Sequence, residues 1–199
     1  MATRMDYIEI KITQSMISMA RERLGRVPNN PNIVRDLSKF NSEPERTIEG
    51  YIGEEMVMPY FGVSSCVDDL NYDFIYNGKR CEVKTITCGF QPPPYYLATV
   101  NSYDLTGVHK QQADYYIFTR TLYNHSLGWI VGYMPCGDFF QHGIFVQKGT
   151  TYAGMTFEKA NATVMEIKQI KSVAELMEPA PSPPPKDTNP KKPEQMKLF

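Results

Sequence analysis

The sequence has few of the features that mark secreted, membrane or zinc-binding proteins. Its four cysteines form no Cys-x-x-Cys pair, and their spacing to the three histidines is not that of a zinc site. We therefore expect reduced, mostly packed thiols, as in a cytosolic compartment. No apolar run approaches the roughly 20 residues that a membrane-spanning helix needs. The charges of Arg4, Asp6 and Glu9 argue against a signal peptide. These absences predict a soluble, cytoplasmic protein.

A large excess of positive charge is also absent, because the net charge is −1. Proteins that attract nucleic acid through their overall field are strongly basic. Any contact with nucleic acid would therefore depend on a local basic groove or on bound metal ions. With 42% hydrophobic and 12% aromatic residues among 199, the chain has enough apolar side chains for one ordinary domain with a core.

The composition changes near Met177, where the chain begins to read MEPAPSPPPKDTNPKKPEQMKLF. Proline and lysine dominate this stretch, and the periodic apolar pattern is lost until the last few residues. Such a composition is typical of an extended, disordered linker of the polyproline type. We expect a folded domain over 1–176, a disordered linker over 177–194 and a separate terminal peptide over 195–199.

Within the domain, helices alternate with strand-like segments. Apolar spacing and end signals predict helices at 12–24, at about 47–60 and at 172–177, with a helical turn at 108–113. Strands are predicted at 71–77, 80–87, 114–120, 128–134 and 162–170. The dipeptide Asn77-Gly78 is a strong hairpin signal and joins the first two strands. This order predicts the α/β or α+β class, with a central mixed sheet flanked by helices.

Three charged residues occupy this hairpin, where sheets usually carry apolar or neutral side chains. Alternate residues of a strand point to one face, so Glu82 and Lys84 project together while Val83 points away. Pairing across the turn would bring Asp73 beside them. Two carboxylates at such a short distance repel each other unless a cation compensates their charge. Their oxygens suit a hard ion such as Mg²⁺. A lysine there could hold an attacking water or offset the charge of a phosphate.

A simpler alternative is a surface hairpin with an exposed Glu–Lys pair, which is a common arrangement. The flanking residues favour the functional interpretation. Val83, Ile75 and Ile86 indicate a central strand, and a central strand rarely carries solvated charges.

The motif resembles that of the PD-(D/E)xK nucleases, the restriction-endonuclease-like superfamily. Asp73 matches the first acid of their signature, although Tyr72 stands where the pattern has proline, and Glu82-Val83-Lys84 matches Glu-x-Lys. The stretch NGKRCEVKT is similar to the sequence that is usual around this motif in that family. HKQQADYYIF and GWIVGY resemble its later strands, so the resemblance spans about 45–175. It implies a restriction-endonuclease-like fold with a central mixed β-sheet.

Members of this superfamily often carry another carboxylate on the preceding helix, within Gly-x-x-Gly-Glu. This chain reads GYIGEE, with Gly50, Gly53 and Glu54 on one side of the predicted helix. Two glycines there would let the helix approach the sheet closely. Glu54 is thus the first candidate for completing the site, with Glu49 and Glu55 as alternatives.

His109 and Lys110 precede a predicted strand and are candidates for contact with a phosphate. They could equally cap a turn, so both interpretations remain open from the sequence.

The chain ends in Gln195, Met196, Lys197, Leu198 and Phe199. This pentapeptide resembles the motif by which bacterial proteins dock on the DNA-polymerase sliding clamp. In that motif an apolar plug formed by Met196, Leu198 and Phe199 would fill a pocket, while Gln195 fixes the orientation. A disordered linker before it would tether the domain to DNA at raised local concentration. An accidental apolar terminus is the alternative.

Taken together, the resemblances imply a nuclease that uses Mg²⁺ or Mn²⁺ to hydrolyse DNA in replication, repair or recombination, in a bacterial or phage-infected cell. They imply that Asp73, Glu82 and Glu54 hold the metal, and that Lys84 assists the attacking water. Two alternatives remain open. The first is a DNA-binding adaptor that keeps the nuclease fold without catalysis. The second is a structure-specific junction resolvase or a nuclease that acts on RNA.

Overall fold

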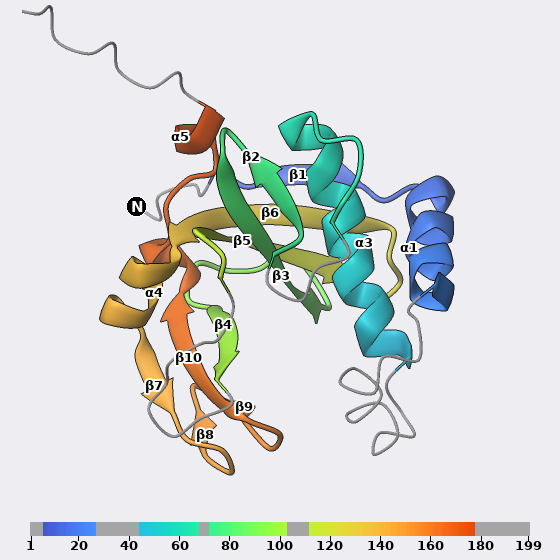
Figure 1. Cartoon of the computed structure of the whole chain (residues 1–199). Helices are drawn as coiled ribbons and strands as arrows, with labels where there is room; N and C mark the ends of the chain where they lie inside the picture. The colour runs from blue at the N-terminus through green and yellow to red at the C-terminus, as the bar shows by residue number, and fades with distance from the viewer. Residues whose placement is uncertain (1–5, 27–43, 68–71, 103–111, 178–199) are drawn as a thin grey trace, which may run out of the picture.

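The computed structural model describes residues 6–26, 44–67, 72–102 and 112–177. They form a curled mixed sheet, a smaller sheet and flanking helices, which makes the fold α+β (Figure 1). The expected class is confirmed at this level. In the described part of the chain, no helix has both the length and the apolar character needed to cross a membrane.

The central sheet has five strands in the order β1-β6-β5-β3-β2. Their bounds are Ile8–Lys11 (β1), Leu127–Pro135 (β6), Tyr115–Leu122 (β5), Lys79–Cys88 (β3) and Phe74–Tyr76 (β2). Strands β3 and β5 run parallel, and the other neighbours are antiparallel. β2 covers only the first residues of β3, so β3 pairs with β5 alone over most of its length.

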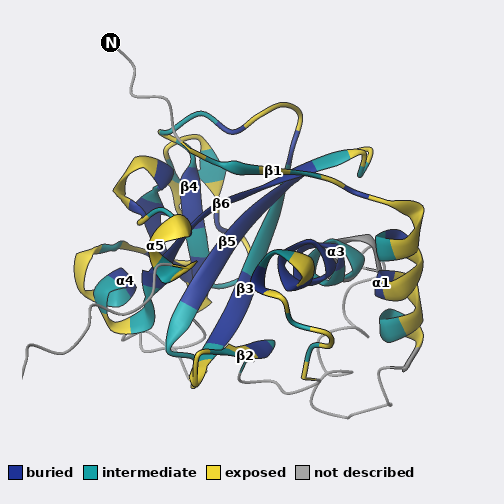
Figure 2. Ribbon diagram, turned by 90° about the horizontal axis from the view of Figure 1, so that it is seen from above, coloured by how far each residue is buried: buried dark blue, intermediate teal, exposed yellow. Residues whose placement is uncertain are grey.

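Helix α3 (Pro44–Phe61) covers one face of this sheet, and α1 (Gln14–Arg26) packs against α3 (Figure 2). Val57 and Phe61 of α3 pack against Val83 of β3 and Ile117 of β5 in one apolar cluster. Residues with odd numbers on β3 therefore face α3, as strand alternation requires.

A smaller sheet and helix α4 (Cys136–His142) pack on the opposite face. This sheet has the order β4-β10-β7, with bounds Leu97–Ser102, Asn161–Glu166 and Ile144–Val146. Tyr116 and Phe118 of β5 join Val100 and Phe139 in its core. Both faces of the central sheet are therefore covered, which explains why β5 and β6 are buried almost throughout.

Two short elements and a hairpin complete the description. The hairpin is formed by β8 (Thr151–Tyr152) and β9 (Met155–Thr156). The 3₁₀ helix η1 (Ile167–Gln169) follows β10, and α5 (Ala174–Met177) is the last described element. Helix α5 includes Met177, which the sequence analysis assigned to the linker.

The predicted hairpin is confirmed. Asn77 and Gly78 both have positive φ, at 48° and 73°, as a two-residue turn of type I′ requires. The strand before the turn is shorter than expected, because it begins at Phe74. Ile75 is 52% exposed, so it does not support the inference of a central strand, whereas buried Val83 does.

The two long helices and the strands around 114–120 and 128–134 are also confirmed, with ends shifted by a few residues. The strand predicted over 162–170 ends at Glu166 and continues as η1. Sequence analysis missed β1, β4, α4 and β7–β9. The helical turn expected over 108–113 falls mostly outside the described residues, as do nearly all of 177–194 and all of 195–199.

Helix α3 approaches the sheet closely at one glycine. A Cβ atom at Gly53 would lie 1.9 Å from Oγ1 of Thr85 and 2.9 Å from Oγ1 of Thr119. No side chain fits there, so glycine sets the distance between α3 and β3. The same role expected for Gly50 is wrong, since a Cβ atom there would meet nothing within 4 Å.

Candidate active site

The hairpin β2–β3 positions Asp73, which directly precedes the first residue of β2. Phe74 pairs with Cys81, and the amide of Asp73 donates to the carbonyl of Cys81 at 2.8 Å. The next outward-facing amide of β3, that of Val83, donates to Oδ2 of Asp73 at 2.6 Å. The Asp73 carboxylate thus accepts the hydrogen bond that a backbone carbonyl of a neighbouring strand would otherwise accept from Val83. This bond holds the carboxylate beside Glu82.

Glu82 and Lys84 lie on the same face of β3, as predicted. Nζ of Lys84 donates to Oε1 of Glu82 at 2.6 Å, and it lies 5.8 Å from the ring centroid of Tyr116. Val83 points the other way into the core beneath α3. Glu82 is only 7% exposed, so the pair is not the exposed surface pair that was the simpler alternative.

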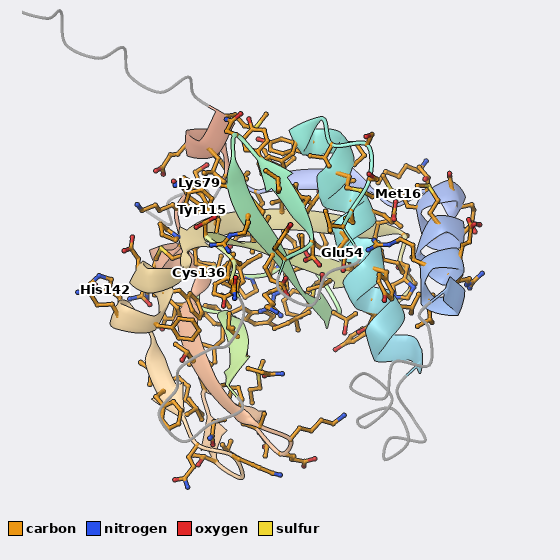
Figure 3. The ribbon with its side chains drawn as sticks, viewed as in Figure 1. Met16, Glu54, Lys79, Tyr115, Cys136 and His142 are labelled. Carbon is orange, nitrogen blue, oxygen red and sulfur yellow. The ribbon has the colours of Figure 1, made fainter. Side chains whose placement is uncertain are left out.

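Glu54 is the helix glutamate that the structure brings to this hairpin. It is buried on the part of α3 that packs on β3 (Figure 3). Its Oε2 lies 2.6 Å from Nη2 of Arg23, which comes from α1. Nη1 of the same arginine lies 3.5 Å from Oε1 of Glu55. Glu55 is therefore held at the α1–α3 contact, and Glu49 lies earlier on α3 in a half-buried position.

The three acids influence one another electrostatically. Burial raises the pKa of Asp73 well above its ordinary value, and the negative charges of Glu54 and Glu82 raise it further. The amide of Val83 and the charge of Lys84 oppose this rise. Burial likewise raises the pKa of Glu54 to about 7, although Arg23 lowers it and Glu82 raises it. Such mutual effects require carboxylates that are close together.

Arg23 and Cys66 are members of this cluster that sequence analysis did not find. Arg23 compensates Glu54 and also stacks on Tyr51, with Cζ 4.7 Å from the ring centroid. A hydrogen bond from the Cys66 thiol lowers the pKa of Glu54, while burial raises the pKa of Cys66 itself. Neither residue has a sequence spacing that links it to the hairpin, because both contacts depend on how α1 and the segment after α3 pack.

The donor chemistry of the cluster fits a hard divalent cation. Among the described residues, the buried Glu82 and Glu54 and the half-buried Asp73 lie with two cationic side chains, Lys84 and Arg23, so negative charge is in excess when all are ionised. In the described residues, no group of three or more Asp, Glu, His or Cys side chains is arranged as a ready metal site. The carboxylates are instead held by Val83, Lys84 and Arg23. A bound cation would favour the ionised forms of Asp73 and Glu54, whose pKa values burial and neighbouring negative charge raise.

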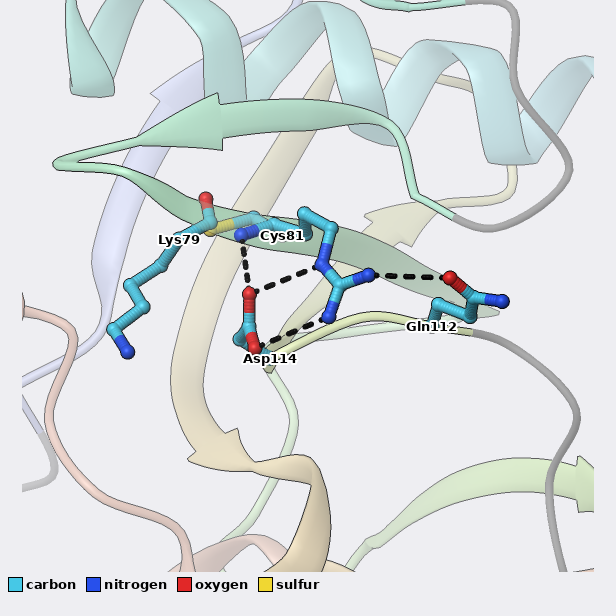
Figure 4. A network of polar contacts seen from close by, with 5 residues as sticks. Lys79, Cys81, Gln112 and Asp114 are labelled. Atoms are coloured by element: carbon cyan, nitrogen blue, oxygen red, sulfur yellow. Dashed lines mark hydrogen bonds and ion pairs between the residues drawn. The ribbon is translucent and has the colours of Figure 1, made fainter.

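A second polar network lies at the beginning of β3 and is exposed (Figure 4). The backbone amide and Nε of Arg80 donate to Oδ2 of Asp114, at 2.9 and 3.2 Å, and Nη1 donates to Oε1 of Gln112 at 3.3 Å. These bonds connect β3 to the segment that leads into β5. The network is structural, because its charges are balanced and lie apart from the buried acids.

The other predicted site residues fall outside the described part of the chain. They are the phosphate-contact candidates His109 and Lys110, and the clamp-binding residues Gln195, Met196, Leu198 and Phe199. These assignments stay predictions.

Comparison with protein-family models, curated proteins and solved structures found no match to this chain.

Proposed function

We propose that this protein is a nuclease of the PD-(D/E)xK type that hydrolyses DNA phosphodiester bonds with the help of Mg²⁺ or Mn²⁺. The main support is the cluster of the buried Glu82 and Glu54 with the half-buried Asp73, in which Lys84 donates to Glu82 at 2.6 Å. Burying several carboxylates is costly unless a cation compensates them. Clusters of carboxylates with raised pKa values are concentrated at functional sites of proteins.

Each residue has a role that follows from its position. Asp73, Glu82 and Glu54 would hold the metal ion, which when bound activates water and stabilises charge on the departing oxygen. Lys84 would hold the attacking water or offset the negative charge of the phosphate. Arg23 favours the ionised form of Glu54, because its charge opposes the rise in pKa that burial causes, although it does not cancel that rise.

The topology also supports this proposal. The fold brings together Asp73, which directly precedes β2, Glu82 on β3, and Glu54 on α3, the helix that approaches the sheet at Gly53. We propose that this arrangement is a variant of the restriction-endonuclease-like fold. The terminal peptide 195–199 would dock on a bacterial-type sliding clamp and deliver the domain to DNA, in the cytoplasm of a bacterial or phage-infected cell.

Cleavage of plasmid and linear DNA tests the enzymatic proposal. We expect cutting in Mg²⁺ or Mn²⁺, none in EDTA, and a loss of about 10²-fold or more in rate for Lys84→Ala, since a charge that stabilises the transition state is removed. The matched control is Lys79→Ala, an exposed lysine at the beginning of the same strand. Equal rates for the two variants would contradict the role of Lys84.

The same assay separates the alternatives. Failure to cut any duplex, flap or junction would favour a DNA-binding adaptor, and preferential cutting of branched DNA or of RNA would favour a structure-specific or RNA-directed nuclease. Deletion of 195–199 tests the tail independently. It should abolish capture of a bacterial-type clamp while leaving the cutting of free DNA unchanged, and unchanged capture would refute the docking role.

A further inference from the structure

A cavity of about 590 Å³ lies at the far end of β3, on the same face as Glu82 and Lys84. Ile86 and Cys88 of β3 contribute to its wall, and they continue the alternation that begins with Glu82. Arg120 of β5 pairs with Ile86 and lines the same cavity. Its volume is within the range of sites for small molecules.

Arg120 is a buried cation for which the described residues provide no acidic partner. It is 3% exposed, and its Nη2 donates to the carbonyl of Leu97. Its Cζ lies 5.8 Å from the ring centroid of Tyr96. No carboxylate of the described residues forms an ion pair with it, and burial lowers its pKa. A buried guanidinium with this environment attracts an anion, and its planar fork of donors matches two oxygens of a phosphate or a carboxylate.

Three large aromatic side chains lie exposed around this cation. Phe90, Tyr95 and Tyr123 are 58%, 63% and 69% exposed, and all three line the cavity. The Tyr96 ring links two of them to Arg120, with centroids 5.9 Å from Phe90 and 5.6 Å from Tyr95. Flat apolar rings left open to solvent next to a buried cation suit a ligand that combines a flat ring with a negative charge.

A nucleotide has this combination, because its base stacks on aromatic rings and its phosphate is drawn to arginine. A base within a duplex has both faces covered by its neighbours, so the ligand must be unpaired. We propose that this cavity binds an unpaired nucleotide of a nucleic-acid strand, with the base stacked among Phe90, Tyr95 and Tyr123 and the phosphate attracted by Arg120.

The position of the cavity favours a nucleic-acid strand over a free nucleotide as the ligand. Ile86 is two residues beyond Lys84 on the same face of β3, which is about 7 Å along a strand and comparable to the spacing of phosphates in an extended single strand. The relation to a cleavage site rests on the proposed function, whereas binding to the cavity does not.

The test measures, by fluorescence anisotropy, the binding of a short fluorescein-labelled oligothymidylate to the full chain in EDTA. Because EDTA prevents cleavage, this measurement is independent of whether the protein is a nuclease. We expect the single strand to bind more tightly than a duplex of the same length. The triple variant F90A/Y95A/Y123A should weaken single-strand binding on the order of tenfold or more and leave duplex binding unchanged.

Two controls address shape and folding. Tyr95→Phe and Tyr123→Phe keep the rings and should bind as the wild type does. Phe145→Ala removes a ring that is 44% exposed on β7, outside the cavity, and should also have no effect. Single-strand binding by the triple variant that equals that of the wild type would overturn the proposal.

A strand with abasic positions tests the base directly with the wild-type protein. It should bind more weakly than oligothymidylate does. The ratio of the two affinities should be about the same as the ratio between wild type and triple variant for oligothymidylate. Equal binding of the two strands, or no binding of either, would overturn the proposal. Competition by thymidine monophosphate distinguishes the source of the nucleotide, and displacement at concentrations as low as those of the unlabelled strand would overturn the assignment to a strand.

Discussion

The two ends of β3 carry opposite charge imbalances on one face of the same strand. Near its beginning, Glu82 lies with Asp73 and Glu54 in a cluster where carboxylates outnumber cations. Near its end, Cys88 and Arg120 line a cavity where a buried cation has no carboxylate partner in the described residues. One end thus lacks positive charge and the other lacks negative charge.

If both proposals hold, two kinds of ligand would bind along this face of β3. A hard cation would balance the acidic end, and an anionic group next to a flat ring would balance the cavity end. A metal-bound nucleic-acid strand supplies both. Variants at the acidic end should therefore change the rate of the chemical step, while variants at the cavity end should change strand affinity.

The largest expected effect is at Asp73. Asp73→Asn keeps an oxygen that can accept from Val83 but removes the charge, so we expect a fall in kcat of about 10²-fold or more at saturating Mg²⁺. The variant F90A/Y95A/Y123A should instead raise KM for single-stranded substrate with little change in kcat. Steady-state cleavage of labelled oligonucleotides measures both quantities. A kcat for Asp73→Asn close to that of the wild type would contradict the separation of roles.

The next effect is a dependence of stability on pH at the acidic end. The pKa of Glu54 is about 7 in the folded protein, compared with an ordinary value of 4.5. The folded state therefore binds the proton more tightly, and the free energy of unfolding should fall as the pH rises from about 4.5 to about 7. Glu54 contributes roughly 2–3 kcal/mol to this fall, and Asp73 acts in the same direction.

Urea unfolding in EDTA at stepped pH measures this dependence, with Glu54→Gln as the comparison. The difference in stability between wild type and variant should shrink or reverse across the window as the pH rises. Mg²⁺ should restore wild-type stability above pH 7, because a cation that binds only the folded state stabilises it. A wild-type advantage that grows with pH in EDTA would contradict the assignment.

A smaller effect concerns the distance between α3 and β3. Gly53→Ala forces a Cβ atom against Thr85 and Thr119, so we expect a loss of about 1–3 kcal/mol of stability. Gly50→Ala is the matched control and should be neutral or stabilising by up to about 1 kcal/mol, since alanine favours helices. Thermal unfolding measures both variants. Strand binding in EDTA should change in neither, because the cavity is formed by other elements.

The smallest effect is expected at the exposed pair of Arg80 and Asp114. Surface ion pairs contribute little, because water screens them. Arg80→Gln should therefore move the midpoint of thermal unfolding less than Gly53→Ala does. A larger shift would mean that the connection between β3 and the segment before β5 is more important than its exposure suggests.

The site was predictable where local rules apply. Asn77-Gly78 specified the turn, and strand alternation then placed Glu82 and Lys84 together and Asp73 opposite. The choice of Glu54 over Glu55 required the packing of α1, because Arg23 engages both acids. No spacing in the sequence shows which of two adjacent glutamates turns toward the sheet.

The missed parts of the fold depend on distant partners. β1 has few residues and exists because it pairs with β6, while β4 and β7 depend on pairing with β10. Short strands have weak local signals. The cavity was missed for the same reason. Phe90, Tyr95 and Tyr123 have no spacing in the sequence that links them to Arg120, and only the tertiary structure brings them together.

The bond between Asp73 and the amide of Val83 has a further consequence for how the protein behaves at high concentration. Strand β2 pairs with β3 only as far as Cys81. In the described residues, no strand pairs with the same edge of β3 after Cys81. Unpaired strand edges invite intermolecular β-sheet growth, and the Asp73 carboxylate blocks this edge with both its hydrogen bond and its charge. Asp73→Ala should thus be more prone to self-association than Asp73→Asn. The same acid would serve both chemistry and colloidal protection, which ties the solubility of the domain to its proposed activity.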